Sequence, residues 1–484
     1  MALTQKLPSL GLLIWLCSSL PALSIDDASF GLLYHRFPLT LAPGERTEAF
    51  GPFFYCQKEE ESKTWAVPPV LSHADNDDLD FEHFDFFWKV STYDRFGQEY
   101  RWQLLQLLSF AGGGTQSDTN VHRFSLFPVY FQQRSQIPEK NYTAVVPFYG
   151  TLKGRLFRDE IKFVLFPLYG QTRKKDVVTD NFLFPILHLR QGEGLHGWQV
   201  WPLFGSEHKE ITTRTNHWGD SEVVGGHDKH FALWPLYFNQ HTGIGTDQEA
   251  RQQALLPFWT SLRSAQRDST TYLWPLGFTH TEDHEKRYEE WGAPWPLVVF
   301  ARGEGKTTDR IWPFFSQSHN TNLVSNWYLW PAYKFNKLKA DPFERERTRI
   351  LLFLYSDVRA KNTEAGTRRR QIDLWPLFTV RRDFEGKSRV QLLSLVEPIL
   401  PNNTGVERNL SPLWSIWRSE GNAKTGATSQ SFLWNLYRRD ATPETRKTSF
   451  LFGLFQRRSS PEGKHWRVLF IPVGKTKQAL PSGR

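Results

Sequence analysis

A short apolar segment with a central proline recurs along the chain and constrains the fold more than any other feature. Its clearest copy is FVLFPLYG at residues 163–170. The prolines of successive copies lie roughly 17–22 residues apart, which is the kind of spacing that marks a repeat architecture. The sequence therefore predicts one domain built from repeats rather than several unrelated domains. Related segments occur at residues 124–131, 182–189, 198–205, 231–238, 272–278, 310–316, 327–335 and 372–380.

The repeated segments have the composition of β-strands. They are rich in Phe, Trp, Tyr, Val and Leu, and Gly, Asn and Asp punctuate the sequence between them. Each is about six to nine residues long, and none keeps the 3.6-residue apolar period of a helix over ten residues. We therefore expect an all-β protein with one strand for each apolar segment and a polar turn between segments.

Read with the period of two of a β-strand, the segment at residues 372–380 has two unequal faces. One face is continuously apolar, and the other is apolar only at its centre. A strand of this kind belongs to a sheet with one face in an apolar phase, either a protein core or lipid. The apolar face comprises Ile372, Leu374, Pro376, Phe378 and Val380.

The central proline needs its own explanation because proline donates no hydrogen bond to a β-ladder and is usually confined to edges or bulges. One explanation is a kink or bulge that is repeated in every strand. The other is that the proline marks the place where each strand turns a corner. The sequence leaves both explanations open.

Three architectures accommodate the repeat. The first is an antiparallel meander of about 20–24 strands, from repeats of ~19 residues, closed as an outer-membrane-type β-barrel. The second is an elongated soluble β-meander or solenoid in which each unit stacks on its neighbours. The third, a β-propeller, requires a four-strand superperiod that the spacing does not show. The closed barrel is the leading expectation and the open meander is its alternative.

The chain divides by the quality of its repeats. Residues 1–24 read as a signal peptide, with an apolar stretch at residues 10–16 and a small-residue cleavage site at residues 22–24. Residues 25–484 form the predicted β-domain, with degenerate repeats at 25–115, regular repeats at 116–474 and a polar tail at 475–484. The polar stretch at residues 206–230 interrupts the spacing and is predicted to be one long surface loop. In the last repeats the proline gives way to Ser394, Asn435 and Gly453.

Export and composition together indicate a protein of the cell envelope. Removal of the signal peptide leaves Cys56 as the one cysteine, so no intramolecular disulfide can form. The mean hydropathy of −0.49 is low for a helical membrane protein. Nucleic acid is not an expected partner because the protein is predicted to leave the cytoplasm. We expect the outer membrane of a Gram-negative bacterium, with the periplasm or cell surface as the alternative.

Several phrases resemble a group of uncharacterised exported bacterial proteins with repeated WPLF or WPLY strands followed by Arg-rich turns. The resemblance covers most of the predicted mature chain, and it implies an origin in a Gram-negative envelope. It implies no activity and no site residues. The phrases lie at residues 146–170, 289–303 and 405–418 and in the many LWPLF and LWPLY cores.

Few residue patterns point to chemistry. The sequence has no phosphate-binding loop, no GxSxG nucleophile motif and no cysteine–histidine zinc pattern, so we expect no enzyme. The weak candidate for a metal site is the acidic stretch at residues 75–82, where alternate carboxylates in a turn suit Ca²⁺. Its candidate ligands are Asp75, Asp77, Asp80 and Glu82. Histidines 280 and 284, and the histidines at 217, 227 and 230, are expected to be solvated loop residues.

Pairs of arginines that follow the apolar segments are the last candidate site. Such a belt at one strand end could contact anionic lipid or the phosphates of lipopolysaccharide, since the guanidinium group binds phosphate well. We accordingly expect a non-enzymatic outer-membrane protein with a structural or passage role, for which lipid or lipopolysaccharide is the expected partner. The alternative is a soluble or peripheral envelope protein that binds a partner or glycan through exposed aromatic residues. The arginines are Arg381, Arg382, Arg438, Arg439, Arg457 and Arg458.

Overall fold

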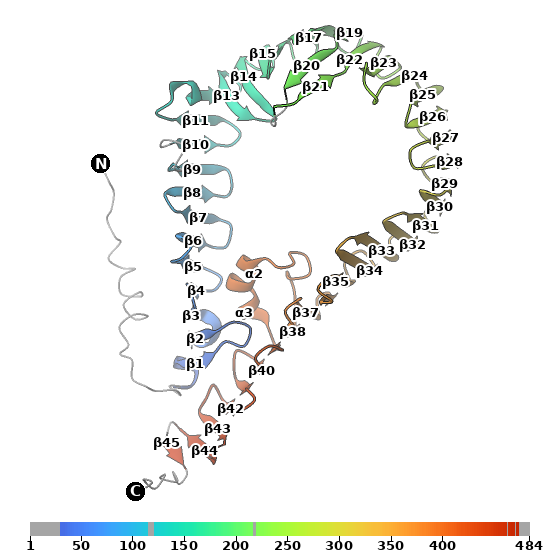
Figure 1. The fold of residues 1–484 in the computed structure, drawn as a ribbon. Helices are drawn as coiled ribbons and strands as arrows, with labels where there is room; N and C mark the ends of the chain where they lie inside the picture. The colour runs from blue at the N-terminus through green and yellow to red at the C-terminus, as the bar shows by residue number, and fades with distance from the viewer. Residues whose placement is uncertain (1–29, 115–120, 216–218, 462, 470, 474–484) are drawn as a thin grey trace. The chain divides into compact units, whose positions relative to one another are not determined.

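The computed structural model of the chain describes residues 30–114, 121–215, 219–461, 463–469 and 471–473. These residues form an all-β protein in which 43 strands belong to one antiparallel meander sheet (Figure 1). The predicted fold class is confirmed, and so is the meander. The predicted signal peptide and the polar tail lie outside the described residues.

The sheet is not closed, which agrees with the open meander rather than with the barrel. Among the described strands, β1 (His35–Pro38) pairs only with β2 (Gly44–Ala49). At the other end, β45 (Ile471–Val473) pairs only with β44 (Gly463–Val468). The chain divides into two compact units, residues 1–105 with 353–484 (unit 1) and residues 106–352 (unit 2).

Unit 2 is a single-layer antiparallel sheet in which each strand pairs with the next along the chain. Its helical structure among the described residues is the 3-10 turn η3 (Pro138–Lys140). The hairpin of β20 and β21 forms a separate two-stranded sheet. The strands are β9 (Leu108–Gly112), β10 (His122–Leu126), β11 (Tyr130–Arg134), β12 (Tyr142–Val145), β13 (Tyr149–Arg155), β14 (Arg158–Val164), β15 (Tyr169–Lys174), β16 (Val177–Phe182), β17 (Leu187–Gly192), β18 (Leu195–Val200), β19 (Phe204–Lys209), β20 (Thr212–Thr215), β21 (Ser221–Val224), β22 (Gly226–Ala232), β23 (Tyr237–Ile244), β24 (Ala250–Leu255), β25 (Trp259–Ser264), β26 (Arg267–Tyr272), β27 (Phe278–Asp283), β28 (Tyr288–Gly292), β29 (Val298–Gly303), β30 (Lys306–Ile311), β31 (Phe315–Asn320), β32 (Leu323–Tyr328), β33 (Tyr333–Ala340) and β34 (Phe343–Ile350).

Unit 1 combines two runs of the meander from the ends of the chain with two short helices, α2 (Thr404–Asn409) and α3 (Ser411–Trp414). The 3-10 turns η1 (Gly31–Leu33) and η2 (Gly51–Phe53) belong to the first run. Besides β1, β2, β44 and β45, the strands are β3 (Phe54–Glu59), β4 (Ser62–Val67), β5 (Leu71–Asn76), β6 (Phe81–Phe86), β7 (Ser91–Phe96), β8 (Glu99–Leu104), β35 (Tyr355–Asn362), β36 (Arg368–Leu374), β37 (Phe378–Arg382), β38 (Lys387–Leu392), β39 (Trp417–Asn422), β40 (Ala427–Phe432), β41 (Tyr437–Ala441), β42 (Arg446–Phe450) and β43 (Phe455–Ser460).

The predicted count of about 20–24 strands is wrong because each repeat contributes a hairpin of two strands rather than one strand. The proline segment lies in the turn between the strands. In the copy at residues 163–170, β14 ends at Val164, the turn spans residues 165–168, and β15 begins at Tyr169. The prolines are therefore not in mid-strand, and the second of the two explanations, a corner, is correct.

The same turn explains the apparent two-faced strand at residues 372–380. This stretch is a hairpin in which Ile372 lies opposite Val380 and Leu374 lies opposite Phe378. The apolar face read from the sequence is thus formed by cross-strand pairs on either side of the turn. The sequences between the apolar segments, which were predicted to be turns, supply most of each strand. Such polar strands are possible because a single-layer sheet has no face that must be wholly apolar.

The predicted long loop at residues 206–230 is also wrong. Strand β19 continues to Lys209, β20 and β21 form a hairpin, and β22 starts at Gly226. β19 pairs directly with β22, and His208 lies opposite Asp228. The stretch is therefore an extra hairpin between two paired strands, and its polar composition is typical of the strands in this sheet.

Helices α2 and α3 join the two runs of unit 1 (Figure 1). They lie in the connection between β38 and β39, and α2 contacts β4 and β5. The Arg408 guanidinium lies 2.6 Å from the carboxylate of Asp85, and its Nε donates to Ser72 Oγ at 2.9 Å. The side chain of Asp85 is only 2% exposed, and the side-chain amide of Asn409 also donates to it, at 3.0 Å. Residues more than three hundred positions apart are thus joined by a buried ion pair.

Substitution of Arg408 by Ala should destabilise unit 1 by about 3 kcal/mol, because it removes one of the two cations beside the buried carboxylate of Asp85 and leaves His83 as its charged partner. The measurement is chemical denaturation, with hydrogen exchange to follow the amides of β4, β5 and β6. The matched control is Lys63→Ala, which breaks an exposed ion pair with Asp77 in the same unit. The control should change the free energy of unfolding by less than about 1 kcal/mol. Equal effects of the two substitutions would contradict the structural role of the Arg408 pair.

Candidate functional site

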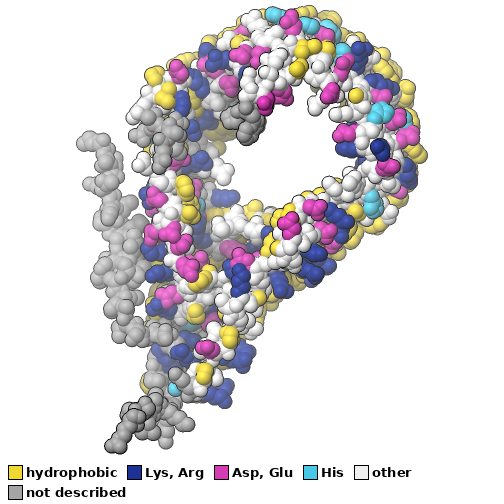
Figure 2. All heavy atoms as spheres, in the orientation of Figure 1, with side chains coloured by type: hydrophobic (Ala, Val, Ile, Leu, Met, Phe, Trp, Pro, Cys, Tyr) yellow, Lys and Arg dark blue, Asp and Glu magenta, His cyan; other side chains and the backbone are white. Residues whose placement is uncertain are grey.

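Apolar turns of unit 2 lie side by side at one edge of the sheet, and we call this set the apolar edge. Every second connection of the meander returns to this edge, and the connections at the opposite edge are mainly polar, with the exposed turn at Leu156 and Phe157 as an exception. Figure 2 shows hydrophobic side chains gathered along one margin of β24 to β31, beside a face rich in charged side chains. The apolar edge comprises residues 127–129, 146–148, 165–168, 183–186, 201–203, 233–236, 256–258, 273–277, 293–297, 312–314 and 329–332.

Backbone hydrogen bonds define the turn and link it to its neighbours. In the copy at residues 165–168, Leu168 N donates to Leu165 O at 2.8 Å, and Pro167 follows a cis peptide bond. Phe166 N donates to Pro147 O of the preceding turn, and Phe184 N of the following turn donates to Pro167 O, both at 2.7 Å. The proline thus occupies a position that only has to accept a hydrogen bond, as its missing N–H requires. The row of turns is a hydrogen-bonded strip.

Aromatic side chains of neighbouring turns contact one another along this strip. The ring centroids of Phe166 and Phe184 lie 5.6 Å apart. Those of Trp201 and Trp234 lie 5.9 Å apart. These separations fall within the range of attractive aromatic pairs. Aromatic residues that precede the prolines therefore pair across neighbouring turns at these two places along the edge.

The side chains of the apolar edge are exposed in spite of their apolar character. Trp234 is 51% exposed, Leu273 is 65% exposed and Phe258 is 62% exposed. Single exposed apolar residues are ordinary on a protein surface, but a contiguous row of them marks a site of contact with another molecule or a membrane. The edge is therefore the strongest candidate for a functional surface in unit 2.

The backbone conformation of the turn leucines supports this assignment. The first residue of several turns is a leucine with positive φ, a region that bulky side chains rarely adopt and that Gly or Asn tolerates better. Each such leucine costs roughly 1–2 kcal/mol relative to the right-handed region. Because the exposed side chain gains little from packing, the repeated choice of leucine favours a use for its apolar surface. The leucines are Leu165, Leu183, Leu233, Leu273 and Leu329.

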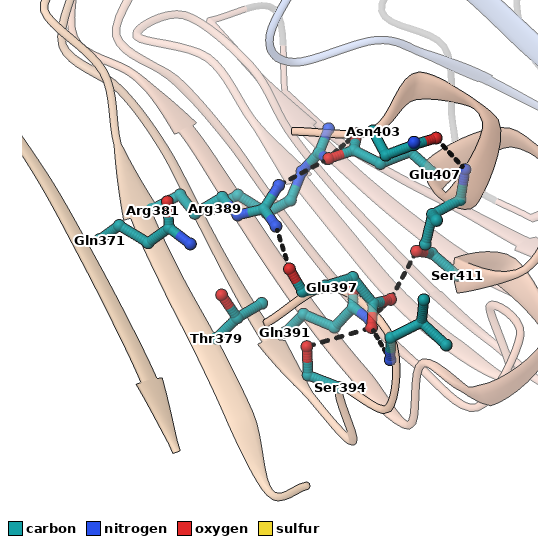
Figure 3. A network of polar contacts seen from close by, with 12 residues as sticks. Gln371, Thr379, Arg381, Arg389, Gln391, Ser394, Glu397, Asn403, Glu407 and Ser411 are labelled. Atoms are coloured by element: carbon teal, nitrogen blue, oxygen red, sulfur yellow. Dashed lines mark hydrogen bonds and ion pairs between the residues drawn. The ribbon is translucent and has the colours of Figure 1, made fainter. Parts of the chain in front are cut away.

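A second candidate lies in unit 1, where charged and polar groups are buried around the connection that holds α2 and α3 (Figure 3). Glu397 is 2% exposed and accepts hydrogen bonds from Gln391 at 2.7 Å and Ser411 at 2.5 Å. Arg381 donates to Glu407 at 2.9 Å, and Arg389 binds the same carboxylate. The network holds the connection in place.

The charges of unit 1 are paired, and this pairing controls their ionisation. Burial would raise the pKa of Glu420, but the guanidinium groups of Arg418 and Arg389 lower it to about 2. Burial also acts to raise the pKa of Glu397, which hydrogen bonds from Ser411 and Gln391 nevertheless hold below its usual value. Both carboxylates are therefore ionised at neutral pH and serve as hydrogen-bond acceptors. Neither of these two carboxylates has the raised pKa that a general acid needs.

The predicted metal ligands are paired with cations rather than arranged around a common point. Asp77 lies 3.1 Å from Lys63 and Asp80 lies 3.7 Å from Arg95. Glu82 lies 3.0 Å from Arg95 and 3.0 Å from His73, and Asp75 lies opposite Glu82 in the β5–β6 ladder. Within the part of the chain that the structure describes, no group of three or more His, Cys, Asp or Glu residues could hold a metal ion. The Ca²⁺ site stays a prediction.

The predicted lipid-contacting arginines do not lie at one strand end. Arg381 and Arg382 are the last two residues of β37. The other four, Arg438, Arg439, Arg457 and Arg458, lie within β41 and β43. At least two of the six arginines form ion pairs within unit 1. Arg381 binds Glu407, and Arg438 is 7% exposed and pairs with Asp440 at 2.7 Å.

The histidines also have local partners. His227 contacts Glu207 at 2.6 Å, and His280 contacts Glu289 at 2.7 Å. His217 lies outside the described residues.

The apolar edge was not predicted from the sequence because its exposed residues were expected to lie inside strands. The signal that could have located it is the proline itself, which a central strand does not accommodate.

The chain matches no protein-family model and no curated protein. None of the described helices has the length and apolar character needed to cross a membrane. The site must therefore be interpreted from its own geometry.

Replacement of Leu183, Leu233 and Leu273 by Gly should stabilise unit 2 or leave its stability unchanged, because Gly removes the cost of positive φ at about 1 kcal/mol per site. The measurement is the free energy of unfolding from denaturant titration. The matched control is Leu189→Gly in β17, which is 51% exposed in an extended strand and should lose roughly 0.5–1 kcal/mol. A clear loss of stability in the triple variant would show that these leucines serve the fold instead.

The stability of unit 1 should fall as the pH rises from about 6.5 to about 9. Burial lowers the pKa of His83, but hydrogen bonds to Asp85 and Asp94 raise it to about 9. In the unfolded chain the pKa of His83 is near 6.5. The protonated imidazole therefore stabilises folded unit 1 fully below pH 6.5, and this stabilisation is lost as the pH rises past the pKa of the folded state. The loss should be on the order of 3 kcal/mol.

The measurement is the pH dependence of unfolding for the native chain and for His83→Gln, whose profile should be flat across this range. His35 affects the stability of unit 1 only at pH values below this range, because burial and the charge of Arg438 lower its pKa to about 3. An unchanged slope in His83→Gln would assign the pH dependence to other groups.

Proposed function

We propose that the protein is a non-enzymatic component of the bacterial envelope that lies on a membrane surface with its apolar edge in one leaflet. The observation that carries the proposal is the contiguous row of exposed apolar turns at a single edge of unit 2. This is the peripheral alternative of the sequence analysis, with lipid as the partner in place of a glycan. The signal peptide predicted at residues 1–24 and the resemblance to envelope proteins support the proposed location.

Strand length favours the peripheral arrangement over a membrane-spanning barrel. A transmembrane strand needs about 9–11 residues, tilted by ~45°. Strands of unit 2 such as β15, β17 and β25 each have six residues, and the longest have eight. Both faces of these strands carry polar side chains, whereas a barrel presents an apolar face to lipid. Only the turns have the composition that a hydrocarbon phase accepts.

The binding energy available at the edge is adequate for stable attachment. Burying a large apolar side chain contributes roughly 1.5–3 kcal/mol, and one that is already half buried contributes about half of that. A single myristoyl chain binds membranes with a constant of only about 10⁴ M⁻¹. Several turns in one rigid strip exceed this value because they insert together. Attachment of this kind depends on apolar contact and should vary little with salt.

The test is flotation of the purified chain with vesicles of phosphatidylethanolamine and phosphatidylglycerol. The native protein should float with the vesicles at low and high salt. Substitution of Trp234, Trp274 and Trp330 by Ser should reduce the bound fraction by at least about tenfold, because it removes apolar area from three turns.

The matched control is the double variant Leu156→Ser and Phe157→Ser at the opposite edge of the sheet. These side chains are 77% and 97% exposed, so their loss removes a similar exposed apolar area. The control should float like the native protein. Equal loss in both variants, or no flotation of the native chain, would overturn the proposal. Resistance to alkaline carbonate together with faster gel migration before heating would favour the closed barrel instead.

A further inference from the structure

A groove crosses one face of unit 2 between β12 and β19, and it is separate from the apolar edge except at Val146, Phe166 and Phe184. Its volume is about 450 Å³, within the range of small-molecule sites. A neighbouring cavity of about 260 Å³ shares His188, Arg190 and Glu207 with it. The groove therefore continues from one cavity into the next around these three residues.

The two ends of the groove differ in character. The end over β12 to β14 is mainly apolar, and its lining includes Leu152, Ile161 and Phe163, with Arg158 at the start of β14 as its charged residue. Leu152 and Phe163 belong to the buried cluster of unit 2, with Ile161 packed against it. This end is preformed because its side chains are fixed by one another. It has the composition of a site for a hydrocarbon chain.

The end over β17 to β19 is polar and carries excess positive charge. Arg190 forms an ion pair with Glu207, and Lys229 approaches the same carboxylate at 3.6 Å. Two cations therefore face one carboxylate. The Nε2 atom of His188 is buried and has no hydrogen-bond partner among the described residues. A negatively charged group with polar atoms would complement this end.

The middle of the groove is open because small side chains lie between the two ends. Gly170 of β15 is the smallest residue of the lining. A Cβ atom built on it would lie 3.7 Å from Lys162 O, an ordinary contact distance, so there is room for a Cβ atom at this glycine. Strands in a sheet are spaced by about 4.8 Å, so the distance from β13 to β17 is roughly 19 Å. The groove therefore suits an extended molecule with one apolar and one acidic end.

We propose that this groove binds a long-chain fatty acid, with its hydrocarbon chain over β12 to β14 and its carboxylate beside Arg190 and His188. A single chain fits the volume, and the one excess positive charge at the end over β17 to β19 matches a single carboxylate. The proposal does not rest on attachment of the apolar edge to a membrane, since it concerns a face of the sheet.

The test is a fluorescence titration of the purified full chain, in buffer without membranes, with cis-parinaric acid as the probe and saturated fatty acids of eight and sixteen carbons as competitors. The sixteen-carbon acid should bind at least tenfold more tightly than the eight-carbon acid. Gly170→Leu should abolish this preference, because the added side chain separates the two ends of the groove. Arg190→Gln should weaken binding of both acids about tenfold.

The matched control is Val178→Leu, which adds apolar volume on the opposite face of β16 and should leave both affinities unchanged. The chain-length preference is a ratio within one variant, so partial loss of folded protein does not alter it. Absence of saturable binding would overturn the proposal. So would an unchanged preference in Gly170→Leu, equal binding of the corresponding fatty alcohols, or tighter binding of a two-chain phospholipid.

Discussion

Hydrogen bonds between successive turns hold the edge of unit 2 together, and the arrangement of its surface depends on them. The sheet of unit 2 has one layer, so it lacks the opposing layer that usually buries a sheet face. Its strands are joined by the backbone ladder and by small clusters such as Phe131, Tyr142 and Phe163. The bond from the amide of one turn to the proline carbonyl of the preceding turn extends the ladder beyond the strand ends. Bonds of this kind fix the turns that contain Phe166, Phe184, Trp234 and Trp330.

This constraint explains which residues the repeat keeps and which it exchanges. In the copy at residues 433–436, Asn435 replaces the proline with a φ of 68°, and in the copy at residues 451–454, Gly453 does so with a φ of 87°. Proline and these two residues share the ability to form a tight turn. The flanking leucines and aromatic residues persist in both copies although the turn itself does not need them. Apolar surface at the edge is therefore a separate requirement from formation of the turn.

The sequence was sufficient to predict the all-β class, the repeat and the meander, because the punctuated aromatic segments are specific to short strands and turns. It was not sufficient for the strand count. The segment 163–170 has the composition of a buried strand, and periodicity cannot distinguish such a strand from two strand ends that flank a turn. Polar strands such as β24 gave no apolar alternation to detect. The acidic turn at 75–82 was located, but its cationic partners Lys63 and Arg95 could be identified only from the strand pairing.

The ion pair between Arg408 and Asp85 in unit 1 could not be predicted from the sequence for a different reason. Arg408 and Asp85 are brought together by helices that interrupt the repeat, and no local pattern relates positions so far apart. At residues 393–416 the repeat is broken, and an exposed apolar turn is replaced by a connection in which Glu397 and Ser411 are buried and hydrogen-bonded to each other. Glu397 and Arg389 are consistent with this exchange, since each would be costly to bury without its partners. The connection at residues 393–416 therefore differs from the other copies of the repeat. It replaces an apolar turn by an internal polar network, whereas the turns of unit 2, and the unit 1 copies at 433–436 and 451–454, keep exposed apolar side chains.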